Sequence, residues 1–353
     1  MEELPAIGKI SPVIFRELAF PHTEIDNETA EDTPETNLGA NIVEVAGQAV
    51  SFATSPIFIA PECGLERIAW FIVHNAISNS VAYGLPPKYL SLNLNLPKEM
   101  TEEQLAFIWK IVHQECAKMD ITVIAEHIGR YDSCRYPLVG GATVTGVGAV
   151  NSYVDPKFVK PGDKILITKG PAIEATGILS TLASDYTERA LGKDTTRKIS
   201  DLFYKMSVVT EATIALSVGI RDDGISAMHT VSEGGIWGGL FELATSAGAG
   251  VKIDQDKIVM ESGVAEVCRL YGLDPYISAG KGALIIACRP HKADEVYRLI
   301  QQQGIKVAVI GEFTEEDQGM VMTRGGNPRP MTRPTVDPFW KAYSVALQYT
   351  KKQ

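Results

Sequence analysis

The stretch MHTVSEGGIWGGLFELA, residues 228–244, decides how the second half of the chain folds. Small and polar residues lead into Glu233–Gly235, and Ile236, Leu240 and Leu243 follow with the spacing of one helix face. Glycine at a helix start lets another group approach the backbone, and the N–H groups of the first turn have no partner within the helix. Together with the helix dipole, they predict a phosphate-binding turn. Periodicity alone favours a simpler alternative, a tightly packed turn that leads into a core helix.

The composition is that of an ordinary globular protein. The 353 residues are 45% hydrophobic and 22% charged, enough for two domains with normal cores. The net charge of −10 argues against nucleic acid or an anionic membrane as a partner, because both require a positive surface. The five cysteines form no CxxC pair, which predicts buried thiols rather than disulfides or a zinc site. Neither a signal peptide nor a transmembrane run is apparent, so we expect a soluble cytoplasmic protein.

The chain divides into four parts. Residues 1–37 are polar and acidic, and we interpret them as a flexible arm with one short helix near Pro12–Leu18. Residues 38–154 and 163–315 each combine helical and strand patterns, with the linker DPKFVKPGD between them. Residues 316–353 form a proline-rich tail that we expect to wrap the surface. The prediction is an α+β fold in two domains.

Hydrophobic periodicity, capping residues and turn signals define the individual elements. The predicted helices cover Glu66–Ser80, Thr101–Met119 (opened by a capping box), Ile173–Ala183, Lys198–Ser217, a glycine-rich helix from Ser232, and Lys292–Gln302. The predicted strands cover Ile42–Val45, Ala49–Ala53, Tyr89–Leu96, Ile121–Ala125, Leu138–Val150, Lys164–Thr168, Gly250–Ile253, Ala283–Cys288 and Val307–Ile310. In the third of these strands, leucines alternate with polar residues, which predicts an apolar face in the core or in a dimer interface.

Several short motifs, each weak alone, occur in a specific order along the chain. They are Gly39-Ala40-Asn41, Ala53-Thr54-Ser55-Pro56, the segment Asn75–Gly84, Lys169-Gly170 with Ile173–Thr176, Ala227-Met228-His229 with Ser232–Gly235, Leu273-Asp274-Pro275 and Ile310-Gly311-Glu312. On these residues the chain resembles the PurM-like superfamily of AIR synthase, selenophosphate synthetase, thiamine-monophosphate kinase and the hydrogenase maturation protein HypE. It looks most similar to the HypE-like, AIR synthase-related branch.

This resemblance implies a fold, a ligand and partners. The implied fold is a ferredoxin-like N-terminal domain, whose sheet joins that of a second copy in a dimer barrel, and an α/β C-terminal domain. ATP would lie between the two domains, with Mg²⁺ held by aspartates, and would activate a small amide or carboxylate-like acceptor by phosphoryl transfer. A homodimer and a maturation-factor protein partner are implied as well.

The sequence departs from the superfamily at the metal-binding positions. Neutral residues stand where the superfamily has aspartates, at Asn41, Ser55, Asn79 and Thr230. Amide and hydroxyl oxygens bring no negative charge to a Mg²⁺ ion, so we expect weak metal binding. Glu126 restores one acidic group, displaced by one position.

The resemblance assigns roles to three sets of residues. The catalytic candidates are Glu126, His127 and His229. The nucleotide-binding candidates are Gly39, Asn41, Thr54, Ser55, Asn79, Lys169, Ser232, Glu233, Gly234 and Gly235. The metal candidates are Asn41, Ser55, Asn79 and Glu126. Simpler alternatives are a packed core histidine for His229, a loop histidine for His127 and a solvated lysine for Lys169.

Two functional hypotheses remain open. In the first, the protein binds ATP between its domains and activates a small acceptor by phosphoryl transfer. In the second, it is a catalytically inactive dimeric paralogue that binds a partner protein or another small ligand. HypE carries its carbamoyl group on a C-terminal cysteine, whereas this chain ends in FWKAYSVALQYTKKQ, which predicts a task different from that of HypE.

Overall fold

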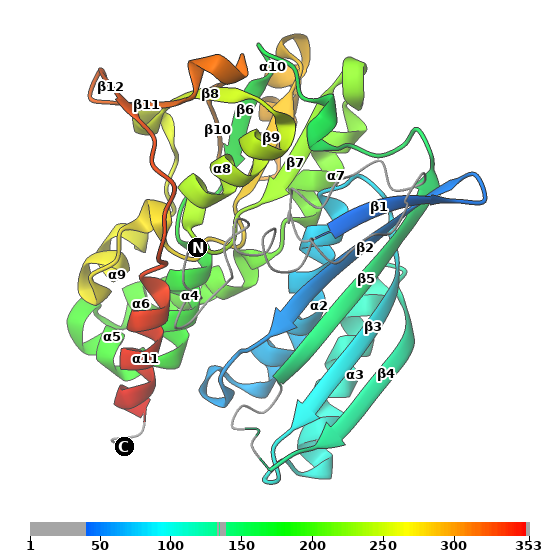
Figure 1. Cartoon of the computed structure of the whole chain (residues 1–353). Coiled ribbons are helices and arrows are strands. Elements are labelled where there is room, and N and C mark those ends of the chain that lie inside the picture. The colour runs from blue at the N-terminus through cyan, green and yellow to red at the C-terminus, as the bar shows by residue number, and fades with distance from the viewer. Residues whose placement is uncertain (1–39, 133, 135–138, 351–353) are drawn as a thin grey trace, which may run out of the picture.

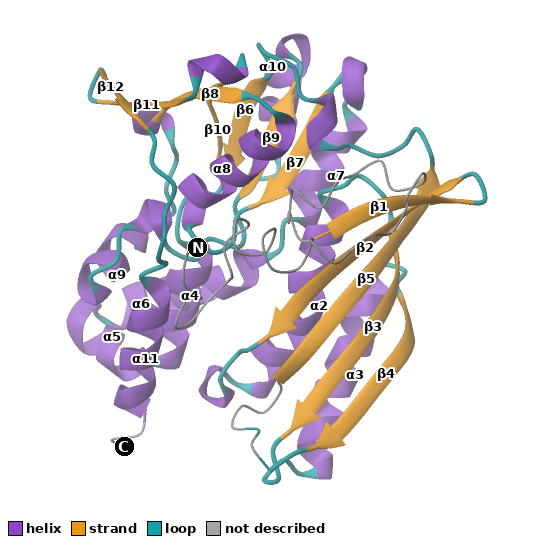
Figure 2. Ribbon diagram, viewed as in Figure 1, coloured by secondary structure: helices purple, strands orange, loops and turns teal. Residues whose placement is uncertain are grey.

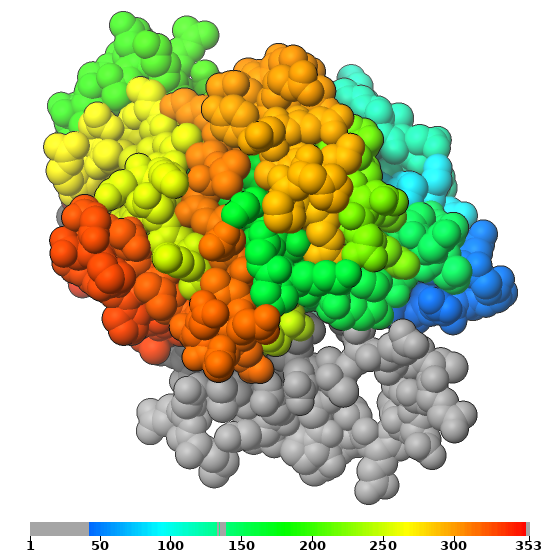
Figure 3. All heavy atoms as spheres, turned by 90° about the horizontal axis from the view of Figure 1, so that it is seen from above, coloured from blue at the N-terminus to red at the C-terminus, as the bar shows by residue number. Residues whose placement is uncertain are grey.

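The computed structural model describes residues 40–132, 134 and 139–350. The arm predicted over residues 1–37 and its helix near Pro12–Leu18 therefore lie outside the described residues. Two sheets, each with its own helices, follow one another along the chain (Figure 1). In the space-filling view, the blue and cyan atoms of the first half gather on one side and the yellow to red atoms of the second half on the other (Figure 3). The predicted mixture of helix and sheet in two halves is confirmed.

The first half is an open sheet with two helices on one face (Figure 2). Its strands are β1 (Ala40–Val45), β2 (Gln48–Ile57), β3 (Pro87–Leu96), β4 (Thr122–Arg130) and β5 (Val139–Ala149), in the order β1-β2-β5-β3-β4, and its helices are α2 (Leu65–Val81) and α3 (Glu102–Lys118). The alternating leucines of β3 are buried in the same core as α2 and α3. The capping box of α3 is confirmed, because Thr101 and Gln104 exchange side-chain hydrogen bonds with each other's backbone N–H groups.

The second half is a seven-stranded sheet between helical layers. Its strands are β6 (Lys164–Thr168), β7 (Ile225–Thr230), β8 (Gly250–Asp254), β9 (Leu284–Cys288), β10 (Val307–Thr314), β11 (Met320–Arg324) and β12 (Asn327–Pro330), in the order β12-β11-β8-β10-β6-β9-β7. Its helices are α4 (Ile173–Leu182), α5 (Ser184–Leu191), α6 (Lys193–Ser200), α7 (Val209–Ser217), α8 (Gly235–Ala247), α9 (Val264–Tyr271), α10 (Ala293–Gln302) and α11 (Phe339–Thr350). Residues Ile165 and Ile167 of β6 pack with α8, whereas Leu166 shares a core with α4, α7 and α10. Within the described parts of the chain, no helix is both long and apolar enough to cross a membrane.

The single long helix predicted over Lys198–Ser217 is wrong. The segment forms the end of α6, a 3₁₀ helix over Asp201–Met206 and then α7. The break lies at Ser207, whose backbone is extended (φ −74°, ψ 136°). The Lys169 Nζ binds the carbonyl oxygens of Lys205 and Ser207 at 3.0 and 2.6 Å. These two carbonyls therefore serve a distant lysine instead of continuing the helix.

Several elements were not predicted, among them β7, α5, α9 and α11. Strand β7 contains polar residues, yet every residue of the strand is buried. The tail adds β11 and β12 to the sheet and forms α11, which reaches back to the first half of the chain. There the Tyr343 hydroxyl accepts a hydrogen bond from the Ala60 N–H at 3.1 Å and lies 3.4 Å from the Phe58 carbonyl oxygen. The C-terminal helix thus helps to hold the two halves together.

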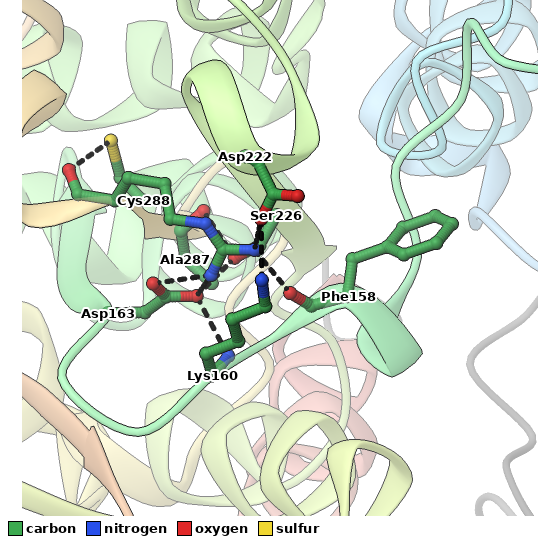
Figure 4. Close-up of polar contacts among 8 residues, drawn as sticks. Phe158, Lys160, Asp163, Asp222, Ser226, Ala287 and Cys288 are labelled. Carbon is green, nitrogen blue, oxygen red and sulfur yellow. Dashed lines mark hydrogen bonds and ion pairs between the residues drawn. The ribbon is translucent and has the colours of Figure 1, made fainter.

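A buried ion pair fixes the linker between the two halves to the second sheet (Figure 4). The Arg289 Nη1 lies 2.7 and 2.6 Å from the two carboxylate oxygens of Asp163. Ser226 and the Lys160 backbone N–H donate to the same carboxylate at 2.7 and 3.0 Å. Both members of the pair are buried, so each needs the other to offset the loss of hydration.

We predict that Asp163→Ala lowers the free energy of unfolding by about 3–5 kcal/mol, because it removes the buried carboxylate of the pair and leaves the buried guanidinium with only the exposed carboxylate of Asp222. Asp222→Ala is the matched control, since Asp222 also contacts Arg289 but its side chain is 77% exposed, and it should cost under about 1 kcal/mol. Denaturant unfolding with an unchanged m-value measures both. An equal loss of unfolding free energy in the two variants would show that the buried ion pair stabilises the fold no more than the exposed one.

Candidate functional site

The two halves of the chain meet along one polar face of helix α2. Asn75, Ser78 and Asn79 are spaced i, i+3 and i+4, so their side chains share that face. Most other residues of α2 that are buried are apolar. Asn75 and Ser78 are each only 5% exposed, and buried polar groups require hydrogen-bond partners. Each of the three finds one in the second half.

The contact made by Asn79 belongs to a chain of hydrogen-bonded side chains that crosses between the two halves. The Thr230 hydroxyl donates to the Asn79 Oδ1 at 2.6 Å. The Asn79 Nδ2 donates to the Ser55 hydroxyl oxygen at 2.9 Å. Three predicted ligand positions, from the end of β7, from α2 and from β2, are thus brought together by direct contact.

Two further contacts lie beside this chain. The Lys281 Nζ donates to the Asn75 Oδ1, and the Val208 N–H donates to the Ser78 hydroxyl at 3.2 Å. We call this set of contacts the α2 seam, made by Ser55, Asn75, Ser78 and Asn79 of the first half and Val208, Thr230 and Lys281 of the second. The seam encloses a small pocket with a cavity volume of about 10 Å³, room for roughly one water molecule. Trp70, Phe71, Met206 and Gly282 complete its lining.

The start of the glycine-rich helix α8 is capped by the chain itself. The Gly234 N–H donates to the Asp337 Oδ2 at 2.9 Å, and the Phe339 N–H donates to the Asp337 Oδ1 at 2.9 Å. Gly235 has a φ of +61°, and a Cβ there would lie 2.5 Å from the Tyr276 carbonyl oxygen, so only glycine fits. The turn that the sequence predicts for phosphate therefore holds a carboxylate of the C-terminal segment in this structure.

The loop before β9 links the tip of α8 to the α2 seam. The Gly280 N–H donates to the Ser232 carbonyl oxygen at 3.2 Å. The Lys281 N–H donates to the Glu174 Oε2 at 3.2 Å. Burial, with a smaller contribution from the negative charge of Glu233, raises the pKa of Glu174 to about 7 and that of Asp337 to about 6. The surroundings of the α8 tip are therefore acidic.

Lys169 is held inside the second half and does not line the seam pocket, but its ammonium binds the Ser207 carbonyl, in the same peptide group whose Val208 N–H donates to Ser78 of the α2 seam. Its Nζ lies 2.6 Å from the Glu211 Oε1, and both side chains are buried. The same ammonium donates to the two carbonyls that break the predicted long helix. The structure gives Lys169 a full set of internal partners, so the solvated-lysine alternative does not describe it.

The three catalytic candidates are not brought together. The His229 Nε2 lies 3.0 Å from the Glu242 Oε2 of α8, and the histidine is buried. Glu126 and His127 lie exposed on β4, an edge strand of the first sheet, and the His127 Nε2 lies 3.2 Å from the Tyr131 hydroxyl. Their catalytic roles stay predictions that this arrangement does not support.

The remaining nucleotide candidates are dispersed. Thr54 is exposed on β2, on the opposite face from Ser55, and its hydroxyl lies 3.0 Å from that of Thr143 on β5. Asn41 belongs to β1, where its backbone pairs with that of Phe52. Gly39 lies outside the described residues.

The α2 seam does not fit a Mg²⁺ ion. The side chains of Ser55, Asn79 and Thr230 are neutral and already satisfy one another through hydrogen bonds, whereas proteins usually bind Mg²⁺ through one or two carboxylates in octahedral geometry. Across the described residues, no group of three or more histidine, cysteine, aspartate or glutamate side chains could hold a metal ion.

Sequence reasoning assigned no site role to Asn75, Ser78, Lys281, Glu174 or Asp337, although Asn75, Ser78 and Glu174 lie within motifs that carry the resemblance. A signal existed for the first three. Asn75 and Ser78 interrupt an apolar helix at helical spacing, and Lys281 stands between two glycines. Asp337 carried no local signal, because it is over 100 residues from the helix tip that it caps.

We predict that Glu174 makes the fold less stable as the pH rises. The pKa of Glu174 is raised above its ordinary value of 4.5, so between pH 4.5 and about 7 the folded chain keeps a proton that the unfolded chain has released. The free energy of unfolding therefore falls as the pH rises through this window. Glu174→Gln should remove roughly 2–3 kcal/mol of that fall between pH 5 and 8, measured by denaturant unfolding. Glu188→Gln on exposed α5 is the control, and identical pH slopes in wild type and Glu174→Gln would refute the assignment.

Comparisons with known proteins agree with this architecture. The family models for the AIR synthase related protein match in both halves, the N-terminal domain over residues 39–152 and the C-terminal domain over residues 160–323. A candidate hydrogenase expression/formation protein of Methanocaldococcus jannaschii is 23% identical and aligns with 94% of this chain and 96% of its own length. The carbamoyl dehydratase HypE of Rhizobium leguminosarum is 25% identical, with 78% of this chain and 76% of that protein covered.

Solved structures share the fold. A HypE–HypF complex includes a chain that is 18% identical, with a TM-score of 0.67 and coverage of 91% of this chain and 98% of the other. Escherichia coli HypE is 21% identical with a TM-score of 0.66, covering 82% and 87%. HypE in complex with ATP is 19% identical with a TM-score of 0.63, covering 95% and 97%. With both halves matched by the models of one family, and with HypE proteins similar over most of its length, this chain belongs to the AIR synthase related protein family as a HypE-like member.

Proposed function

We propose that this HypE-like protein binds a nucleotide at the α2 seam and does so without a tightly held Mg²⁺ ion. The observation that carries the proposal is the contact of Ser55, Asn79 and Thr230. These residues come from three distant segments, and each stands where the superfamily resemblance implies a ligand of the nucleotide–metal complex. A relative of the same fold is known in complex with ATP, which supports a nucleotide as the ligand.

Nucleotide binding at this place requires the seam to open. The pocket holds about one water molecule in this structure, so α2 and the Lys281 loop must separate to admit a phosphate. The hydrogen bonds that break when the seam opens contribute about 0.5–1.5 kcal/mol each, a cost that phosphate contacts with the same groups can offset. The activity implied by the resemblance is phosphoryl transfer to a small amide or carboxylate-like acceptor. Without carboxylate ligands for Mg²⁺, we expect its rate to be low.

A second candidate function is that of a catalytically inactive paralogue that binds a partner protein. Two observations favour it. The polar side chains of the seam already hydrogen-bond to one another, and the carboxylate of Asp337 occupies the α8 tip. A relative's fold occurs in a HypE–HypF complex, so a maturation factor is the partner class that we propose. The two candidate functions differ in whether nucleotide binds at all.

Calorimetric titration with a non-hydrolysable ATP analogue tests the first function. We expect the wild type to bind with an affinity that changes little when Mg²⁺ is replaced by EDTA. The double variant Asn79→Asp/Thr230→Asp should gain binding in Mg²⁺ relative to EDTA, because paired carboxylates attract the divalent ion, with circular dichroism as the control for folding. If the wild type releases or absorbs no heat at millimolar analogue in either buffer, the nucleotide function is wrong and the partner-binding function remains.

We also propose a homodimer through the helix-free face of the first sheet. Phe52 of β2, Tyr89 of β3 and Ile124 of β4 are 46%, 42% and 56% exposed there, which is unusual for large apolar residues at the surface of a monomer. Phe52→Asp should shift the protein from dimer to monomer, because the charge would be buried at the interface. Light scattering after size exclusion measures the mass. Phe107→Asp, on 45%-exposed Phe107 of α3, is the control, and a dimer that survives Phe52→Asp would contradict the proposed interface.

A further inference from the structure

The pocket of the α2 seam contains one formal charge among its described lining residues, the ammonium of Lys281. The other polar groups of the lining are two asparagines, one serine and one threonine. These side chains can donate hydrogen bonds to an anion, but they bring no net charge to it. Among the described side chains that line this pocket, only Lys281 therefore brings a positive charge to a phosphate.

The backbone around Lys281 is fixed on both sides. Gly280 is bound to the carbonyl of Ser232 at the α8 turn, and the Lys281 N–H is bound to Glu174. Gly282 has a φ of +106°, and a Cβ there would lie 2.6 Å from the Lys205 carbonyl oxygen. A left-handed backbone and this close approach both require glycine. The loop is thus built so that the Lys281 side chain crosses to the first half of the chain.

One acceptor of the Lys281 ammonium in this structure is the Asn75 Oδ1. This is a neutral amide oxygen, and a phosphate oxygen is a stronger acceptor for an ammonium because hydrogen bonds between charged groups are roughly twice as strong. Asn75 keeps a second contact, from its Nδ2 to the Pro56 carbonyl at 3.0 Å, so it stays anchored if the ammonium turns to a ligand. A phosphate oxygen can replace the Asn75 Oδ1 as an acceptor of the Lys281 ammonium. This replacement requires no additional charged protein group in the pocket, because Lys281 already lines it.

Carboxylates near the α8 tip, on the side of the Lys281 loop away from α2, disfavour the binding of an anion on that side. Glu174 accepts from the Lys281 backbone, and Glu233 and Asp337 lie within electrostatic reach of Glu174. A phosphate would be repelled by these groups if it approached the α8 tip, where Asp337 is already bound. At the seam it would meet Lys281 first, together with the uncharged donors of Asn79 and Thr230. The seam is therefore the more favourable place for an anion.

We propose that Lys281 is the residue that recognises the phosphate of the ligand, and that it supplies the positive charge that a divalent metal provides where carboxylate ligands are present. This inference rests on the proposed nucleotide function and deepens it, because it names the group responsible and makes recognition independent of metal. The ligand class is a nucleotide or another small molecule that carries a phosphate group.

The test is titration of the full-length protein with the ATP analogue AMP-PCP, in EDTA and in Mg²⁺, for wild type and three variants. Lys281→Met should weaken binding in EDTA by about 10- to 100-fold, the range expected for a lost hydrogen bond to a charged group. Lys281→Arg keeps the charge and should retain most of the affinity. Lys306→Met is the matched control, because the Lys306 ammonium likewise binds a neutral carbonyl oxygen, that of the Met260 backbone, but does not line the pocket. Thermal unfolding of each variant checks that it is folded.

Each outcome separates this inference from the function on which it rests. If wild type and Lys281→Met bind AMP-PCP equally in EDTA, nucleotide binding stands and the role of Lys281 is wrong. If wild-type binding disappears in EDTA and returns with Mg²⁺, the metal-independent recognition is wrong. If the wild type fails to bind in both buffers, the proposed function itself falls and the inference with it. Should Lys281→Met not fold, the comparison of Lys281→Arg with wild type in EDTA decides, since a tenfold loss with the charge retained would contradict recognition by charge.

Discussion

The arrangement of this protein depends on the polar face of helix α2. Three side chains on an otherwise apolar helix, those of Asn75, Ser78 and Asn79, are covered by the second half of the chain and need hydrogen-bond partners there. A buried polar group left without one costs about 1–3 kcal/mol. The partners are offered by Lys281, Val208 and Thr230, which come from different loops and strands. In this arrangement all three are satisfied at once, so the seam contributes to how the two halves are held together.

The chemical character of the seam follows from its lack of carboxylates. Aspartates at Asn79 and Thr230 would repel each other and would call for a cation between them. An amide and a hydroxyl instead form a direct hydrogen bond. The chain of Ser55, Asn79 and Thr230 carries no charge, and the charged groups beside it are Lys281 of the seam and, beyond the seam, Glu174 and Asp337. The site therefore differs from a phosphoryl-transfer centre in electrostatics while keeping a closely related fold.

The sequence predicted most elements because their signals are local. The alternation in β3 and the capping box of α3 depend on neighbours within a few residues, and both are confirmed. The break before α7 was missed because its cause, the ammonium of Lys169, is more than 35 residues away in the chain. Strand β7 was missed because a fully buried strand can carry polar residues when distant groups satisfy them, as Glu242 does for His229.

The candidate site was predicted in part, for the same reason. The resemblance in motif order selected Ser55, Asn79 and Thr230, which do meet. It could not select Lys281 or Asp337, because their roles follow from where the loop and the C-terminal segment lie in space. The most direct measurement is a crystal structure of the protein with AMP-PCP and Mg²⁺. We predict a phosphate group bound to the Lys281 ammonium, with no metal ion between Asn79 and Thr230. A Mg²⁺ ion held by those two side chains, or a nucleotide bound away from the seam, would contradict it.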